Sequence, residues 1–317
     1  MPASDAPLWP DTVAVFYAER ACAIRSEDTR KTWGYTYAQL QRRHPDKQLR
    51  DFSADDLVAF LTQQDDAGPR WAPTTVRAYR ICLQSLFGWA RATGRIDTDP
   101  THDIAKRVRI RPGRVRTPHW LSEAQIGGLL ATTEGKGLLQ QRDRIVLMLG
   151  IFTGLRAGEI GALRWRHVDL AGGWLVFPGK GGRPDRLAVP PQLSDALTCW
   201  QDRVVTAVGA AIGDVPVAPA LHTPRGPRAE AVLEASRGLG HEGVRRIVRA
   251  RGTEIDIPDL RPHDLRRSLA GTLDARSVPV QDIRLVLRHH HVGTTQTYLA
   301  DNPLRVHDRM RSFTIGR

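Results

Sequence analysis

The chain has 317 residues, 41% of them hydrophobic and 25% charged, which is enough for about two globular domains. Its net charge of +12 at pH 7 makes a polyanion the leading partner, because lysine and arginine gain affinity by releasing counterions from nucleic acid; an inert basic surface is the alternative. No bilayer-length apolar run, secretory signal or disulfide framework is visible, so we expect no membrane contact and a cytoplasmic protein whose three cysteines lie in the core.

Residues 8 to about 105 have the apolar spacing of helices. The clearest one runs from Thr74 to Thr93, where apolar residues recur at intervals of three and four. We expect Thr74 to cap its start and Gly94 to end it. Arg77 and Arg80 lie on other faces of this helix, where they either contact DNA or form a solvated polar surface. Little sequence precedes the first helix, so we expect no separate DNA-binding domain before it.

A basic segment follows and reads KRVRIRPGRVR, six basic residues in eleven. Its composition is unsuited to a core, and the central Pro112-Gly113 pair argues against a continuous helix or strand. We interpret residues 106–118 as an interdomain linker that lies along the phosphate backbone; a merely solvated linker is the alternative. The candidate DNA contacts here are Lys106, Arg107, Arg109, Arg111, Arg114 and Arg116.

The next segment predicts two helices. Ser122 and Gln125 form a capping-box pair, and the apolar run from Ile145 to Phe152 is a buried helix that stops at Gly154. Arg156 then stands between apolar segments, where an unpaired charge is costly. We therefore expect Arg156 to have a partner, either a fixed anion or a bound one.

A β-hairpin is predicted after these helices. The β-prone runs 174–177 and 187–189 flank the sequence PGKGGRPDR, which places Lys180 near the tip together with Arg183 and Arg186. Beyond a helix over 193–208, residues 209–228 have no usable periodicity and are interpreted as a loop. A helix over 241–250 is strongly basic, and Arg245 and Arg246 are further candidate DNA contacts.

The segment from Arg261 to Tyr298 carries the clearest functional signal. Pro262 suits the first turn of a helix, and His263 and Arg266 then share one helical face, where a phosphate is a fitting ligand. His289 and Tyr298 follow after a short helical hairpin, with His290 as the rival of His289.

Together, the candidate residues fit phosphoryl transfer to a side-chain hydroxyl. Two guanidiniums clamp the non-bridging oxygens, the base His289 takes the proton of Tyr298, and Lys180 acts as general acid on the departing oxygen. No paired carboxylates, nucleotide-binding loop or metal-ligand spacing is present, so we expect no metal and no cofactor; three adjacent histidines cannot all face one ion. The set is Arg156, Lys180, His263, Arg266, His289 and Tyr298.

These motifs resemble the tyrosine recombinase (phage integrase) family. The resemblance rests on TGLRAGE, on HDLR, and on Leu287-Arg288-His289 followed by Thr294, Thr295 and Tyr298. Arg288 replaces the family's usual glycine, which we expect either to distort the turn or to add a phosphate contact. The resemblance assigns the six residues the roles given above, makes Glu159 the support of the first arginine, and implies a 3′-phosphotyrosyl intermediate that stores the bond energy without ATP.

The resemblance also implies a mainly α fold with a small β-hairpin or sheet (α+β). A helical, SAM-like core-binding domain (1–105) and the basic linker (106–118) would precede a catalytic domain (119–317). The expected activity is site-specific recombination of double-stranded DNA by a tetramer on synapsed DNA, with accessory DNA-bending or directionality factors as possible partners. Alternatives are type IB topoisomerase-like strand relaxation and a catalytically silent DNA-binding relative. The tail from Pro303 to Phe313 could dock on a neighbouring subunit or pack on its own.

Overall fold

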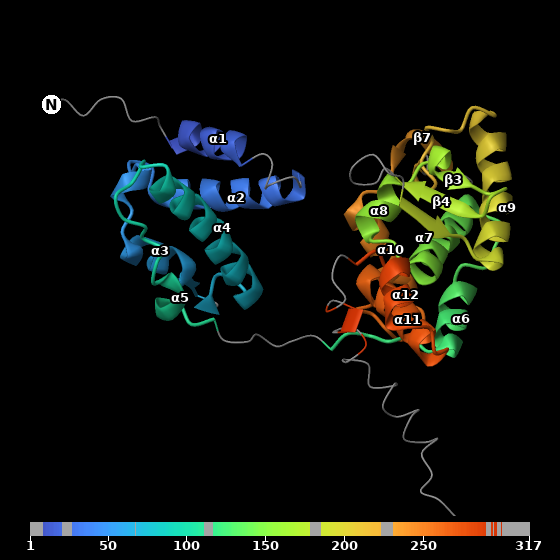
Figure 1. Ribbon diagram of the computed structural model, residues 1–317. Helices are drawn as coiled ribbons and strands as arrows, with labels where there is room; N and C mark the ends of the chain where they lie inside the picture. Colours follow the sequence, from blue (N-terminus) through green and yellow to red (C-terminus); the bar gives the residue numbers. More distant parts are fainter. Residues whose placement is uncertain are drawn as a thin grey trace, which may run out of the picture. The chain divides into compact units, whose positions relative to one another are not determined.

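The computed structural model describes residues 9–20, 27–66, 68–110, 117–177, 185–222 and 231–289 and the positions 293, 295, 296 and 299. The chain divides into two compact units, residues 1–116 and 117–317. Helices dominate both units, and the strands form small antiparallel sheets (Figure 1). This confirms the predicted mainly α fold.

Unit 1 is a helical unit with one short hairpin. Its elements are α1 (Trp9–Glu19), α2 (Glu27–Arg43), η1 (Leu49–Asp51), α3 (Ala54–Leu61), β1 (Gln64–Asp65), β2 (Gly68–Pro69), α4 (Pro73–Ala92) and α5 (Ile104–Arg107). The expected cap at Thr74 is wrong, because α4 starts earlier: Ala72 is the N-cap and Pro73, which has no N–H to leave unbonded, fills the first helical position. Gly94 ends the helix as predicted, with φ of 68°.

The core of unit 1 lies beneath the apolar face of α4. Leu83, Leu86 and Phe87 are fully buried there and share one cluster with Phe16 of α1. Val108, only 4% exposed, also belongs to this cluster. The expectation that the basic segment contributes nothing to a core is therefore wrong at Val108. This residue is the C-cap of α5, and its side chain packs into the core of unit 1.

Unit 2 contains the longer part of the chain. Its elements are α6 (Glu123–Ala131), α7 (Leu138–Thr153), α8 (Ala157–Ala162), η2 (Trp165–His167), β3 (Val168–Asp169), β4 (Trp174–Phe177), β5 (Asp185–Ala188), α9 (Pro191–Val208), β6 (Pro219–His222), β7 (Val232–Gly238), α10 (His241–Thr253), α11 (Pro262–Ala275) and α12 (Val280–Val286). The capping box of Ser122 and Gln125 is confirmed, as is the end of α7 at Gly154.

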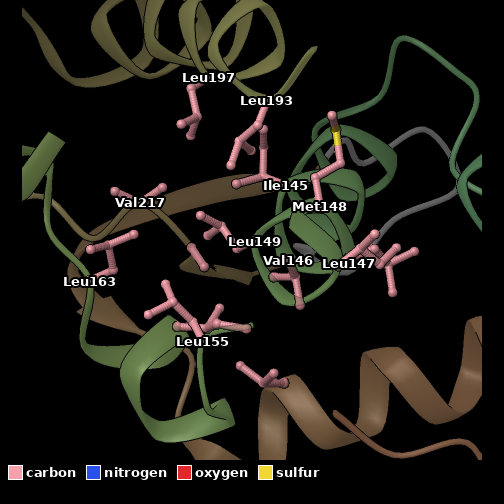
Figure 2. Packing of buried hydrophobic residues seen from close by; sticks show 14 of the residues in the cluster. Ile145, Val146, Leu147, Met148, Leu149, Leu155, Leu163, Leu193, Leu197 and Val217 are labelled. Atoms are coloured by element: carbon pink, nitrogen blue, oxygen red, sulfur yellow. The ribbon is translucent and has the colours of Figure 1, made fainter. Parts of the chain in front are cut away.

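Helix α7 is the centre of unit 2. Its residues from Ile145 to Leu149 are all buried, and Figure 2 shows Ile145 facing Leu193 of α9 while Leu149 lies nearer to Leu155. A helix that is apolar around much of its circumference must be covered on several sides. Helices α9, α10 and α11 supply that cover, which fixes the position of the chain that leaves α7.

The strands differ in part from the prediction. The β4–β5 hairpin is confirmed, and β3 adds a third strand in the order β3-β4-β5. The interpretation of residues 209–228 as a loop is wrong at β6, which pairs with β7. The glycine and proline residues around β6 give this segment a low strand propensity. The strand forms because it pairs with β7. Cys82 is buried as expected, but Cys199 is exposed.

A buried group of charges joins α7 to α10. Asp143 accepts hydrogen bonds from Arg142 (2.8 Å) and from Arg251 (2.7 Å), and Arg251 also donates to the carbonyl of Thr132 at 3.0 Å. Arg251 also pairs with Glu254 at 3.0 Å, so two arginines face two carboxylates within the unit. Arg251, on the basic helix α10, therefore points inward and is unavailable to a ligand.

No helix within the described ranges is long and apolar enough to cross a membrane.

The buried position of α7 predicts a large difference between two leucines of the same helix. Leu149 is 0% exposed and Leu139 is 43% exposed. Leu149→Ala should lower the free energy of unfolding by about 2–5 kcal/mol, because it removes buried methyl groups and leaves a cavity. Leu139→Ala should change it by less than about 0.5 kcal/mol. Urea denaturation of the full chain measures both; equal losses would contradict this packing.

Candidate active site

Arg266 of α11 is the most buried of the predicted site residues that the structure describes, with only 1% of its surface exposed. Its Nη1 donates to the carbonyl of Gly154 and its Nη2 to the carbonyl of Leu287. One guanidinium therefore joins the end of α7 and the end of α12 to α11. A guanidinium has five N–H donors, so the same group can hold two carbonyls and still bind an anion.

Arg156 is the N-cap of α8 and lies two residues after Gly154. Its backbone N–H donates to Glu159 at 2.8 Å, and its Nη1 donates to the same carboxylate at 3.1 Å. The partner expected for Arg156 is thus a fixed anion, Glu159, the acidic residue of the TGLRAGE motif. The expectation of an apolar setting is wrong, because the Arg156 side chain is 51% exposed at the surface of unit 2. An exposed, tethered guanidinium is accessible to a phosphate.

Helix α11 starts as predicted at Pro262 and presents His263 within its first turn. Asp264 caps this helix, since the backbone N–H of Arg261 donates to its carboxylate at 2.9 Å. Partial burial and the positive charges of Arg267 and Arg266 lower the pKa of His263, although part of the residue remains open to solvent. A neutral imidazole at this position can donate one N–H to an oxyanion.

His289 lies in the same electrostatic environment. Burial, with only 5% of the residue exposed, and the charges of Arg266 and Arg156 lower the pKa of His289 to about 4, and His263 adds to the effect. The ring is oriented by Nδ1, which lies 2.8 Å from Oγ1 of the buried Thr295. Four predicted residues from three separate segments, Arg156, His263, Arg266 and His289, are therefore gathered at one place.

The turn before His289 is a regular helix end, although Arg288 has φ of 51°. The N–H of His289 bonds the carbonyl of Arg284 at 3.0 Å and that of Arg288 bonds Leu285 at 2.9 Å, the pair that defines a Schellman motif. The expected distortion is thus absent. A left-handed conformation costs a residue with a side chain about 1–2 kcal/mol, and so glycine is favoured at such a position.

The Arg288 side chain also differs from the expected phosphate contact. Its Nη2 lies 2.6 Å from Glu159 Oε2 and its Nη1 lies 3.4 Å from Asp185 Oδ2, while the guanidinium covers the ring of Phe177. These contacts, and that between Thr295 and His289, were not predicted from the sequence. The available signal for the Arg288 contacts was the presence of an arginine at a position that needs a positive φ.

Several predicted residues fall outside the described residues: Lys180, Arg183, His290, Thr294, Tyr298, the tail, and Arg111, Arg114 and Arg116 of the basic segment. Of the candidate DNA contacts that are described, Arg77, Arg109, Arg245 and Arg246 are exposed and Arg80 is partly buried. Lys106 and Arg107 form surface ion pairs with Asp103 and Asp55. The roles of all these candidate contacts in DNA binding stay predictions.

The low pKa of His289 predicts a pH-dependent stability. Above pH 6.5 the ring is neutral in both the folded and the unfolded chain, whereas between pH 6.5 and about 4 only the unfolded chain takes up the proton. Stability should therefore fall as the pH falls through this window, by on the order of 3 kcal/mol from this ring. His289→Gln should show a correspondingly shallower loss in urea denaturation series. Parallel curves for the two proteins would rule out a neutral, buried His289.

Comparison with known proteins identifies the family. The model of the Phage integrase family matches residues 119–305. A tyrosine recombinase XerC of Roseiflexus sp. (strain RS-1) is 28% identical over 80% of this chain and 75% of its own. The fold is similar to a XerH site-specific recombinase bound to palindromic difH substrate (TM-score 0.63, 15% identity, 97% of this chain and 85% of that one). It is also similar to a lambda integrase (75–356) dimer bound to a COC′ core site (TM-score 0.61, 17% identity, 98% of each chain). Since the family match spans more than half of the chain, the protein belongs to the phage integrase family, the tyrosine recombinases, which break and rejoin DNA at specific sites.

Proposed function

We propose that the protein cleaves each DNA strand through a 3′-phosphotyrosyl bond to Tyr298 and rejoins it without a metal ion or ATP. The proposal rests on the proximity of four residues in unit 2, Arg156, His263, Arg266 and His289. Arg266 holds them together through its hydrogen bonds to the carbonyls of Gly154 and Leu287. Two guanidiniums and two neutral imidazoles at one site suit a phosphodiester. They supply fixed positive charge beside groups that can donate or accept a proton.

The two arginines act on the non-bridging oxygens of the scissile phosphate. Charge grows on these oxygens as the fifth bond to phosphorus forms, and guanidiniums held before DNA binds stabilise it without reorganising. Arg266 is held by two carbonyls and Arg156 by Glu159, so both are preorganised. His263 donates a hydrogen bond to the same oxygens.

Proton transfer completes the step. The Tyr298 hydroxyl attacks phosphorus and gives its proton to His289, the P–O5′ bond breaks, and Lys180 gives a proton to the departing O5′. The low pKa of His289 keeps it neutral and able to accept. The negative charge of a bound phosphate offsets the neighbouring arginines and raises this pKa toward the working range. In the reverse direction, the 5′-hydroxyl of a partner strand attacks the phosphotyrosine and releases Tyr298.

The remaining assignments concern DNA and assembly. Residues 1–105 serve as a core-binding domain, and the basic segment 106–118 follows the phosphate backbone with its lysine and arginines. Strand exchange needs four active sites on two duplexes, so the protein acts as a tetramer on synapsed DNA. Support comes from the dimeric, DNA-bound state of the related lambda integrase and from the net charge of +12. We also propose a cytoplasmic, nucleoid-associated location and accessory DNA-bending factors.

The covalent intermediate predicts a trappable adduct. DNA crosslinked to the protein would first be sequenced to find its site, and a duplex with a nick beside the cleaved phosphate would then be tested in EDTA without ATP. The wild type should accumulate an SDS-resistant protein–DNA adduct, because the short cleaved fragment diffuses away. Tyr298→Phe should form none, since it lacks the attacking oxygen.

The matched control is Tyr35→Phe, which changes an exposed tyrosine of unit 1 and should keep the adduct. An adduct in Tyr298→Phe at the wild-type level, or none in the wild type, would show that Tyr298 is not the nucleophile.

A further inference from the structure

Arg288 occupies a backbone conformation that favours glycine, yet its side chain is largely buried. The residue has φ of 51° at the end of α12, and the side chain is 14% exposed. Glycine would form the same Schellman turn without strain. The arginine therefore contributes through its side chain rather than through the turn.

The guanidinium of Arg288 joins three elements. It lies 4.7 Å from the ring centroid of Phe177 at the end of β4, within the range of a cation–π contact, and its Nη1 lies 3.4 Å from Asp185 at the start of β5. Phe177 and Asp185 face each other as the last cross-strand pair of the hairpin before residues 178–184. Arg288 thus contacts both members of the pair from which the segment with Lys180 emerges.

The same guanidinium reaches the carboxylate that holds Arg156. Its Nη2 lies 2.6 Å from Glu159 Oε2, and Glu159 also accepts from the side chain of Arg156. The next residue in the chain is His289. One side chain therefore ties the base of the hairpin to α8 and to the turn that carries His289.

We propose that Arg288 is a positioning residue, which anchors the base of the β4–β5 hairpin so that Lys180 reaches the departing O5′. The inference rests on the proposed function of Lys180 as general acid. A direct phosphate contact is disfavoured, because the guanidinium faces two carboxylates and an aromatic ring, and its planar fork suits such bridging.

A substrate with sulfur in place of the departing O5′ tests the inference. A thiolate leaves without a proton, so this substrate does not need the general acid, whereas the ordinary phosphodiester does. Arg288→Gly should slow cleavage of the ordinary substrate by at least about tenfold, part of the 10²–10⁴-fold that a general acid contributes. On the sulfur substrate the variant should come within about threefold of the wild type, by the same reasoning.

Two variants accompany Arg288→Gly. Asp185→Asn weakens one contact of the anchor and leaves the turn at Arg288 unchanged. It should lower the cleavage rate less than Arg288→Gly does, and the sulfur substrate should restore this rate as well. Arg276→Ala removes an exposed arginine that pairs with Glu123 and should leave both rates unchanged. Near-ultraviolet circular dichroism and the DNA affinity of each variant report whether the fold is intact.

The outcomes separate the inference from the proposed function. Lys180→Ala restored by sulfur supports the general acid, and failure of that rescue removes Lys180 from the mechanism. Independently, restoration of Arg288→Gly by sulfur supports the anchor of the hairpin, whichever of its residues carries the proton. An equal loss on both substrates, or no loss on either, would overturn the positioning role of Arg288.

Discussion

The arrangement of the site depends on the buried guanidinium of Arg266. A charge at this depth is costly unless its donors are bonded, and the carbonyls of Gly154 and Leu287 meet that need. The bonds also determine where the chain goes next. Arg156 follows Gly154 by two residues and His289 follows Leu287 by two residues, so one cation positions two further members of the site. The ends of α7 and α12 are held together within unit 2 before any DNA binds.

Two left-handed residues lie beside these carbonyls. Gly154 has φ of 62°, and a Cβ there would come within 3.0 Å of Leu287 and 3.2 Å of Leu269, so the position also lacks room for a side chain. Arg288 has φ of 51° but points its side chain away, onto Glu159, Asp185 and Phe177. Rigid turns at both positions make the site preorganised, which is the condition under which fixed charges stabilise a transition state well. Burial, together with the same dense positive charge, lowers the pKa of His289 and keeps the ring neutral.

Much of the helical fold was predictable because local signals agreed with tertiary packing. The capping box of Ser122 and the stop at Gly154 both placed helix ends correctly. Strand β6 could not be predicted, since its register depends on pairing with β7 rather than on alternation in its own residues. Residue types and spacing indicated four described residues that lie together, Arg156, His263, Arg266 and His289. The exposure of Arg156 and the contacts of Arg288 could not be predicted, because they depend on segments far apart in the chain. Periodicity carries no such information.

In the proposed mechanism, Arg156 and Arg266 stabilise negative charge on the non-bridging oxygens of the phosphate. A methylphosphonate at the cleaved position replaces one non-bridging oxygen by a methyl group and is neutral. The decisive measurement compares the cleavage rates of Arg156→Ala and the wild type on this substrate and on the ordinary phosphodiester. Arg156→Ala should lose at least about 10²-fold on the ordinary phosphodiester and much less on the methylphosphonate, because the neutral phosphonate carries one negative charge less and lacks one of the two oxygens that the guanidiniums stabilise. An equal loss on the two substrates would contradict this mechanism.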